Sequence, residues 1–531
     1  MWLKKEFLIF ATLFYCFSLV DGCYEGERAA LMSFKSLLTD PSNRLYSWKG
    51  ENCCSWKGIK CSSSGHVVVV DLRNPHPIEV KININKEVVS NSKNTSDFAL
   101  RVPAEISNLT KLTYLNLSNA MFQDSIAMQF TNLTSLRSLD LSCANLVPDY
   151  SSVSVSLTFP LKLDFSSSLL SFISYGYLSS PNLRWLEGLQ RLRYLVLTGR
   201  IPIAQFLNLT NIASLDMSSN VLKSSIPDLL SNITTLSVLD FSRNDLNGHI
   251  PYLPQLEELS VASNPAVTID LVSMFAVPWS KLTLLDICFT RVGGTIPPSL
   301  SNSTSLTFFR AHGCSIQGSI PSSITKLEKL SVLMLNENDI TGQIPASMSS
   351  LTTLQYLSLF QNRLEGNIPI SICQISSLEY LNLEWNDLTG RLPLCIIQLP
   401  KLSVLYIQRN RLNGNMPFSL FQKSRLDEIS LGTSGLSVEI DDPDQTFVQT
   451  FQPKILDFTS CNMRGEIPDF FSNFTSLVVL NFANNSLSGA IPQWLFNLPA
   501  LSIPALPMNN FIVFIPPMIH LKSSLFPTMI N

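Results

Sequence analysis

Side chains suited to non-covalent recognition recur in this chain at a fixed spacing. Between residues 308 and 409, aromatic and charged residues return at steps of 24 positions, as Tyr356 and Tyr380 do. Aromatic and Arg side chains are enriched in the hot spots of protein interfaces. We predict a ligand-binding set that consists of Phe308, Arg310, Tyr356, Phe360, Tyr380, Trp385, Tyr406 and Arg409. The alternative is that the aromatic rings only pack on one another along a sheet.

Residue patterns for covalent or metal chemistry are missing from the sequence. The 5 His residues are scattered without metal-ligand spacing. No C-x-x-C, G-x-S-x-G or phosphate-binding Gly motif occurs. A net charge of −3 gives no overall basic field for nucleic acid. We therefore expect no enzyme, no cofactor, no metal and no nucleic-acid partner.

A repeat must position the recognition side chains. From Leu112 onward the spacing L-x-x-L-x-L-x-x-N-x-L-x-G-x-I-P recurs in about seventeen copies, which is the signature of leucine-rich repeats. Two clear copies are Leu330-Leu333-Leu335-Asn338-Ile340-Gly342-Ile344-Pro345 and Leu354-Leu357-Leu359-Asn362-Leu364-Gly366-Ile368-Pro369. A further strand is expected at 67–72. The fold class predicted is an α/β solenoid, a curved right-handed superhelix with a parallel sheet on its concave face.

The spacing within one copy indicates what each residue does. Apolar residues two apart point to the same side of a short strand, so stacked copies fill a continuous interior. The Asn stands where the chain leaves the strand, and its amide can bond buried backbone groups. Cys314 and Cys461 take that Asn position, so we predict buried structural thiols. From their positions in the repeat, we predict that Asn362 is buried and that Asn382 faces solvent.

Length and composition agree with such an array. The chain has 531 residues, 45% of them hydrophobic and 15% charged, which excludes a disordered protein. After residues 1–22, we expect a cap at 23–65, about 18 repeats at 66–516 and a tail at 517–531. The repeats contain an insertion at 73–100 and an irregular region at 144–200. These loops either contact a partner or lie in solvent.

Residues 1–22 are typical of a signal peptide. Lys4 and Lys5 precede an apolar run from Phe7 to Val20, and Gly22 offers a small residue for cleavage. An uncleaved membrane anchor is the alternative. We expect a protein of the secretory pathway, located at the cell surface or in the extracellular space.

The segment around four Cys residues resembles the N-terminal cap of plant extracellular leucine-rich-repeat proteins. It contains Cys23, Glu27-Arg28, Leu31, Phe34-Lys35, Asp40-Pro41, Leu45, Trp48 and Cys53-Cys54-Ser55-Trp56-Lys57-Gly58-Ile59-Lys60-Cys61. The L-x-G-x-I-P half of the repeat is similar to the plant type as well. Among these proteins the chain most resembles the receptor-like proteins, which have an ectodomain, one transmembrane helix and no kinase.

The resemblance implies more than the repeat does. It implies disulfides between Cys23 and Cys53 and between Cys54 and Cys61, whereas the sequence alone permits three connectivities. It also implies a peptide or protein ligand in plant defence or developmental signalling, and a co-receptor kinase as a second partner.

The C-terminal end departs from the family pattern, because no C-terminal cap or membrane anchor follows residue 516. Membrane association is expected only if the full-length gene encodes an anchor. Two other hypotheses are a secreted inhibitor similar to polygalacturonase-inhibiting proteins and a non-functional truncated receptor fragment.

Nine N-x-S/T sequons occur, and they differ in their position within the repeat. Most lie four residues before the first apolar residue of a repeat, on an exposed rim. We predict glycosylation at Asn94, Asn108, Asn132, Asn208, Asn232, Asn302 and Asn473. Asn116 falls on a strand and Asn484 falls beside the repeated Asn, so neither is included.

Overall fold

The computed structural model describes residues 23–37, 43, 45–73, 81–82, 88–89, 99–100, 104–118, 121–122, 130–141, 178–179, 189, 191–197, 199–200, 209–220, 222–441 and 451–512. The predicted signal peptide and tail, most of the insertion and of the irregular region, Asn94, Asn208 and Cys143 lie outside these residues. The chain divides into two compact units, Met1–Asn247 and Gly248–Asn531. They are called the N-terminal unit and the C-terminal unit below.

The N-terminal unit begins with the cap. Helix α2 (Glu25–Ser36) buries Glu27, Ala30, Leu31 and Phe34, an i, i+3, i+4, i+7 set that lies on one helix face. Lys35 donates from Nζ to the Trp48 carbonyl at 2.8 Å. Two disulfides link Cys23 to Cys53 and Cys54 to Cys61, as the family resemblance implied. The cap is therefore joined covalently to the first strands.

Short parallel strands follow the cap hairpin. Strands β1 (Ile59–Cys61) and β2 (Val67–Asp71) are antiparallel, and β2 then pairs with β6 (Tyr114–Asn116) in parallel. The ladder continues through β8 (Ser138–Leu141), β10 (Tyr194–Leu197), β12 (Ser214–Asp216) and β13 (Val238–Asp240). The other elements of this unit are η1 (Cys53–Ser55), β3 (Lys81–Ile82), β4 (Val88–Val89), β5 (Ala99–Leu100), η3 (Ala104–Asn108), β7 (Met121–Phe122), β9 (Leu178–Ser179), β11 (Gly199–Arg200) and η7 (Asp228–Asn232); β14 (Asn247–Gly248) lies at the boundary.

The C-terminal unit carries a longer parallel ladder. Its main strands are β15 (Glu258–Ser260), β17 (Leu284–Asp286), β19 (Phe308–Arg310), β21 (Val332–Met334), β23 (Tyr356–Ser358), β25 (Tyr380–Asn382), β27 (Val404–Tyr406), β30 (Glu428–Ser430), β32 (Ile455–Asp457), β34 (Val479–Asn481) and β36 (Ile503–Ala505). Each pairs with the next in register, so that Leu357 lies between Leu333 and Leu381. The fixed repeat length thus places equivalent side chains on neighbouring strands.

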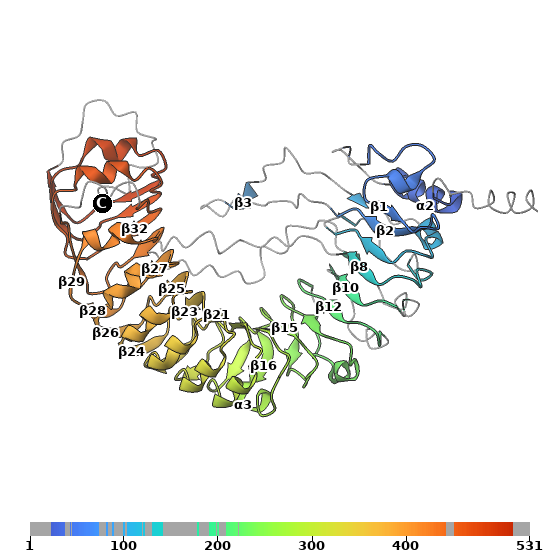
Figure 1. Ribbon diagram of the computed structural model, residues 1–531, viewed down its shortest axis with the longest axis horizontal. Helices are drawn as coiled ribbons and strands as arrows, with labels where there is room; N and C mark the ends of the chain where they lie inside the picture. The colour runs from blue at the N-terminus through green and yellow to red at the C-terminus, as the bar shows by residue number, and fades with distance from the viewer. Residues whose placement is uncertain are drawn as a thin grey trace, which may run out of the picture. The chain divides into compact units, whose positions relative to one another are not determined.

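A second set of parallel strands forms where the repeat reads N-x-L-x-G. Figure 1 shows β24, β26 and β28 on the side of this unit opposite to the main strands. The set comprises β16 (Ala266–Asp270), β18 (Arg291–Gly293), β20 (Gln317–Gly318), β22 (Asp339–Gly342), β24 (Arg363–Asn367), β26 (Asp387–Arg391), β28 (Arg411–Asn413), β29 (Asn415–Pro417), β31 (Ser437–Glu439), β33 (Arg464–Gly465), β35 (Ser486–Ala490) and β37 (Asn510–Ile512). The repeat analysis did not predict these strands.

The return segments are 3₁₀-helices of five or six residues. They are η8 (Pro298–Asn302), η9 (Ser322–Lys326), η10 (Ala346–Ser350), η11 (Ile370–Gln374), η12 (Leu394–Gln398), η13 (Phe418–Lys423), η14 (Asp469–Asn473) and η15 (Gln493–Asn497). Among the described residues only α2 and α3 (Leu271–Met274) are α-helices. The helical half of the expected α/β class is therefore mostly 3₁₀, because the strands and turns of a 24-residue repeat leave room for one or two tight turns only.

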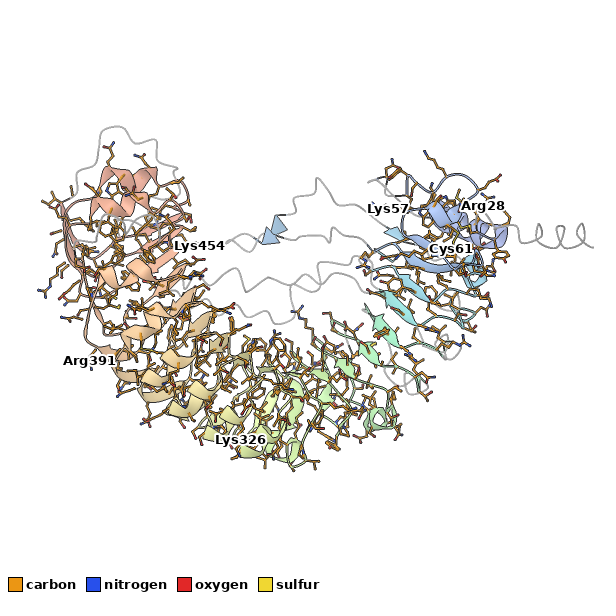
Figure 2. The ribbon with its side chains drawn as sticks, viewed as in Figure 1. Arg28, Lys57, Cys61, Lys326, Arg391 and Lys454 are labelled. Atoms are coloured by element: carbon orange, nitrogen blue, oxygen red, sulfur yellow. A yellow bond between two sulfur atoms is a disulfide. The ribbon has the colours of Figure 1, made fainter. Side chains whose placement is uncertain are left out.

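Side chains fill the space between the strands and the 3₁₀-helices (Figure 2). Leu333, Leu357 and Leu381 are each 0% exposed. Full burial of a Leu side chain stabilises a fold by about 1.5–3 kcal/mol, and Leu357→Ala would cost about 2–5 kcal/mol. The core is thus a row of equivalent leucines, as the spacing predicted.

The repeated Asn holds each turn. Asn362 donates from Nδ2 to the carbonyls of Leu335 (2.9 Å) and Leu359 (3.1 Å), and its Oδ1 accepts from Ile340 N at 3.1 Å. One amide therefore bonds two consecutive repeats, which confirms the role assigned to this position. Cys314 donates from Sγ to the Ile287 carbonyl at 3.0 Å in the same way. It is buried, and so is Cys461, as predicted.

Candidate ligand-binding face

Two tyrosines form the centre of the predicted recognition set. Tyr356 and Tyr380 are register partners on β23 and β25, and their rings stack at 4.0 Å with 5° between their planes. Burial of the rings raises the pKa of both hydroxyls above its usual value. Both side chains are half-buried. The two rings therefore do pack on one another along the sheet, and each remains partly open to solvent.

Trp385 and Arg409 form a second pair just beyond the strands. The Arg409 guanidinium lies 3.9 Å from the centre of a Trp385 ring, and Trp385 is 48% exposed. Both residues have φ of 53°, in the left-handed region. This turn conformation, sparsely populated for residues other than Gly, recurs before the repeated Asn. The pair thus has the exposure and the cation–π chemistry of a binding hot spot.

Tyr406 differs from the expectation, because it is only 4% exposed. Its ring meets that of Tyr380 edge-on at 6.1 Å, and its hydroxyl donates to the carboxylate of Glu428 on the next strand. Tyr406 occupies the second outward row, where side chains of both neighbouring strands cover it. It therefore packs against the Tyr380 ring and offers little surface to a ligand.

A polar row runs beside the tyrosines. Gln408 donates from Nε2 to the carboxylate of Glu384, and Asn382 lies 3.3 Å from both the Tyr380 hydroxyl and the Glu384 carboxylate. Desolvation raises the pKa of Glu384 above its ordinary value, although the bonds from Gln408 and Asn382 oppose the shift. Asn382 is 3% exposed, so the prediction that it faces solvent was wrong. The long side chains on either side of it close over the short amide.

Asp457 ends this row on β32. Its carboxylate accepts from the Thr459 hydroxyl at 2.6 Å and lies 3.1 Å from Ser430 Oγ. Desolvation again raises the pKa of the carboxyl group. The predicted binding set did not include Glu384, Gln408 or Glu428. Their spacing was the signal that could have found them, because each lies one or two repeats of 24 residues after Phe360 or Tyr380.

The other predicted residues stand apart from this centre. Phe308 lies two strands away from Tyr356, and the Arg310 guanidinium is 5.8 Å from the Phe308 ring. Arg310 also approaches the Asp286 carboxylate at 3.6 Å. Phe360 is half-buried at the strand exit. The structure therefore brings together Tyr356, Tyr380 and Tyr406, and separately Trp385 with Arg409.

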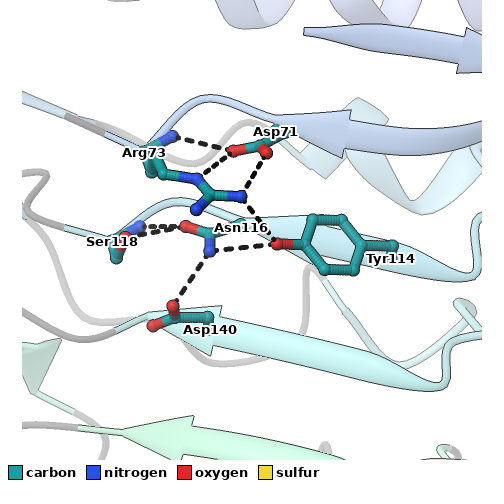
Figure 3. A network of polar contacts seen from close by, with 6 residues as sticks. All are labelled: Asp71, Arg73, Tyr114, Asn116, Ser118 and Asp140. Atoms are coloured by element: carbon teal, nitrogen blue, oxygen red, sulfur yellow. Dashed lines mark hydrogen bonds and ion pairs between the residues drawn. The ribbon is translucent and has the colours of Figure 1, made fainter. Parts of the chain in front are cut away.

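The corresponding face of the N-terminal unit is occupied by its own side chains (Figure 3). Arg73 pairs with Asp71 at 2.7 Å and approaches the Tyr114 hydroxyl at 3.3 Å. Asn116 donates to Asp140 at 2.9 Å and accepts from Ser118. The amide of the Asn116 sequon is thus engaged and 6% exposed, which agrees with its omission from the glycan set.

The other cysteines that the structure describes are either disulfide-bonded or free thiols. Cys373 in η11 and Cys395 in η12 form a disulfide that sequence analysis did not predict. Cys288 is a buried free thiol whose Sγ lies 2.7 Å from His312 Nδ1. Desolvation raises the pKa of the Cys288 thiol far above its usual value and lowers the pKa of His312. Both groups are therefore neutral near pH 7, and this pair lacks the thiolate that a nucleophile requires.

The sequons of the rim are exposed where the structure describes them. Asn108, Asn132, Asn232, Asn302 and Asn473 are all in the exposed class. Asn484, which was omitted, is exposed too. Their occupancy remains a prediction.

Family comparisons agree with the repeat geometry. The model of the leucine rich repeat N-terminal domain matches residues 25–62, and the Leucine Rich Repeat model matches 353–375, 377–399 and 476–498. The chain has the leucine-rich-repeat fold. Both matched models describe cap or repeat sequence, and the described residues contain no kinase domain.

Curated relatives of this chain include plant receptor-like proteins. Receptor-like protein EIX2 of Solanum lycopersicum is 35% identical over 130 residues, which is 20% of this chain and 12% of the relative. Receptor-like protein 6 of Arabidopsis thaliana is 27% identical over 340 residues, 57% of this chain and 30% of the relative. The chain thus spans less than a third of the length of these relatives.

Solved plant ectodomains share the fold. The structure of PEPR1 with AtPEP1 superposes with a TM-score of 0.62 at 24% identity, covering 92% of this chain and 69% of that one. The Arabidopsis receptor kinase HAESA, in complex with the peptide hormone IDA and the co-receptor SERK1, gives 0.54 at 23% identity, covering 92% and 90%. Among the described residues of this chain, no helix has both the length and the apolar character needed to cross a bilayer.

Proposed function

We propose that this chain is an extracellular recognition module of a receptor-like protein and binds a peptide or protein ligand without catalysing a reaction. The ligand contacts the outward face formed by Tyr356, Phe360, Tyr380, Trp385 and Arg409, which is called the aromatic face below. The observation that carries the proposal is the cation–π pair of the exposed Trp385 with Arg409, together with the Tyr356–Tyr380 stack.

The aromatic face is suited to binding because its backbone is rigid. Each tyrosine stands on a strand that is hydrogen-bonded to both neighbours. A ligand therefore meets side chains that are already ordered, and it gains contact area at a low cost in conformational entropy. Tyr406 is buried and packs edge-on against the Tyr380 ring, so little rearrangement is needed on association.

Proteins similar to this chain suggest its location, its biological role and its second partner. Receptor-like proteins are among them, PEPR1 was solved with AtPEP1, and HAESA was solved with the peptide hormone IDA and the co-receptor SERK1. We extend to this chain a location at the cell surface or in the extracellular space, a role in plant defence or developmental signalling, and a co-receptor kinase as second partner.

The test is selection of binding peptides from a random displayed library against the full secreted chain. Enriched peptides are then measured against Trp385→Ala and Tyr380→Ala. We expect each substitution to weaken binding by tenfold or more, since central aromatic residues contribute about 2 kcal/mol or more at interfaces.

A matched control lies on the opposite side of the same unit. Ile370 begins η11 and is 74% exposed, so Ile370→Ala should leave peptide affinity unchanged. Peptides that bind the wild-type chain and both aromatic variants equally would place the ligand elsewhere and contradict the proposal.

A further inference from the structure

A hollow of about 270 Å³ lies in the N-terminal unit. Three cationic side chains line it, Lys111, Arg137 and Arg191, together with the hydroxyl groups of Ser62, Ser64 and Ser135. A single water needs only about 10–15 Å³ of such space, so the hollow accommodates a polyatomic ion with its hydration.

The repeat brings the three cations together. Lys111 and Arg191 each precede the first buried leucine of their repeats, Leu112 and Leu192. Arg137 lies on the intervening repeat, where its N–H donates to the Thr113 carbonyl at 2.8 Å. Adjacent strands are about 4.8 Å apart, so the flanking cations emerge roughly 10 Å from one another with Arg137 between them. Long Lys and Arg side chains span that distance.

The cap hairpin supplies a second group of lining residues. The turn between β1 and β2 closes with Ser62 N donating to the His66 carbonyl at 2.8 Å, and Ser62 Oγ lies 2.9 Å from Ser64 Oγ. Glu27 fixes this turn, because its carboxylate accepts from Val67 N at 2.9 Å and contacts His66 Nδ1 at 3.1 Å. The serine hydroxyls are therefore held on a hairpin anchored to helix α2.

The described residues do not neutralise the charge of the hollow. No ion pair involves Lys111, Arg137 or Arg191 within the described part of the chain, and no Asp or Glu from that part lines the hollow. By contrast, Arg28 and Arg73 in the same unit have carboxylate partners at 2.6 and 2.7 Å. Three like charges that converge without a counter-charge repel one another, and an anion between them removes that repulsion.

We propose that this hollow binds a sulfate or phosphate group. Three positive charges favour an anion with high charge density, and the serine hydroxyls add neutral donors around it. A tetrahedral oxyanion has enough oxygens to meet the cations and the serine hydroxyls at once, whereas a single carboxylate has two. The group is either a free inorganic anion or an ester group carried by a ligand, and the two share the same chemistry.

Titration calorimetry of the full secreted chain with sodium sulfate and sodium phosphate tests the proposal. Sodium chloride keeps the ionic strength constant, because surface electrostatics are screened by salt. We expect saturable binding of both anions and at least tenfold weaker binding of acetate. Arg137→Gln and Arg191→Gln should each weaken phosphate binding by at least fivefold. The three cations are exposed, so these variants should fold, as their melting curves will verify.

Arg193 provides the matched control. It is an exposed arginine next to the hollow but not part of its lining, and its N–H donates to the Arg137 carbonyl at 2.8 Å. Arg193→Gln should leave the anion affinity unchanged. An equal loss in all three variants would indicate diffuse charge attraction and overturn the proposal, as would the absence of saturable heat.

Tyrosine O-sulfate and O-phosphate distinguish the two sources of the anion. Ester affinity at least equal to that of the free ion assigns the hollow to a ligand-borne group. Binding of the free ion alone assigns it to an inorganic anion. In either case Arg191→Gln must weaken the binding of the ester as it weakens the binding of the free ion. If it does not, the ester binds elsewhere.

Discussion

The ring of Tyr380 lies parallel to the ring of Tyr356, with centroids 4.0 Å apart, and both residues occupy paired positions of adjacent strands. Their separation of 24 residues is one repeat, so the repeat length itself produces the contact. Such cross-strand aromatic pairs stabilise a sheet beyond the area that they bury.

The stack predicts a measurable coupling between the two tyrosines. In a double-mutant cycle of Tyr356→Ala, Tyr380→Ala and the double variant, we expect an interaction energy of about 0.5–1.5 kcal/mol. Urea unfolding of the full chain, followed in the C-terminal unit, measures it. Strictly additive effects would show that the rings are neighbours without mutual stabilisation.

A second prediction compares two buried amides, Asn362 and Asn382. Asn362→Ala leaves the Leu335 carbonyl and the Ile340 N–H without the hydrogen bonds that Asn362 provides. Each unsatisfied group costs about 1–3 kcal/mol of stability. Asn382 bonds a single backbone group, the Glu384 N–H at 3.1 Å, and its other contacts are the half-buried side chains of Tyr380 and Glu384, which can turn to water. Asn362→Ala should therefore lower the Tm more than Asn382→Ala does. Equal Tm shifts in thermal melts would contradict the role of the repeated Asn.

How far the sequence predicts this structure depends on whether a contact repeats. Leu357 and Asn362 belong to the repeat, so spacing alone predicted their burial. Tyr406 and Asn382 are covered by Glu428, Tyr380 and Glu384, non-repeating neighbours whose side-chain directions no periodicity specifies. The Cys373–Cys395 disulfide needs two 3₁₀-helices in a particular mutual orientation, and it too escaped prediction.

That disulfide gives a third prediction. It closes a loop of 22 residues between adjacent repeats, and a cross-link of this length stabilises a fold by about 3 kcal/mol in the chain-entropy model. The double variant Cys373→Ser/Cys395→Ser should lower the free energy of unfolding of the C-terminal unit by that order. Dithiothreitol should no longer shift the melting of this unit in the variant. A persisting shift would mean that another bond is being reduced.

The carboxyl group of Glu384 leads to a pH prediction. Desolvation raises its pKa in the folded chain above the unfolded value of about 4.3. The folded state therefore favours the protonated form, so the ionised group reduces stability at neutral pH. Glu384→Gln should raise the Tm at pH 7, and this advantage should vanish as the pH falls below the unfolded pKa.

The control for this prediction is Glu365, an exposed carboxylate on β24. Glu365→Gln should change the Tm little at either pH. If Glu384→Gln lowers the Tm at pH 7, the hydrogen bonds from Gln408 and Asn382 outweigh desolvation, and the assigned direction of the pKa shift is wrong.

Glycan occupancy separates sequons that look alike in the sequence. The side chains of Asn132, Asn232 and Asn302 are exposed, whereas the Asn116 amide donates to Asp140 at 2.9 Å and is 6% exposed. A glycan on Asn116 would break that bond and displace Tyr114 from its contact with Arg73, so the folded chain excludes it. In glycopeptide mass spectrometry of the secreted protein, we expect glycans at the three exposed sites and none at Asn116. Substantial occupancy of Asn116 would show that modification precedes folding of this strand, and the protein would then lack the polar network of Figure 3.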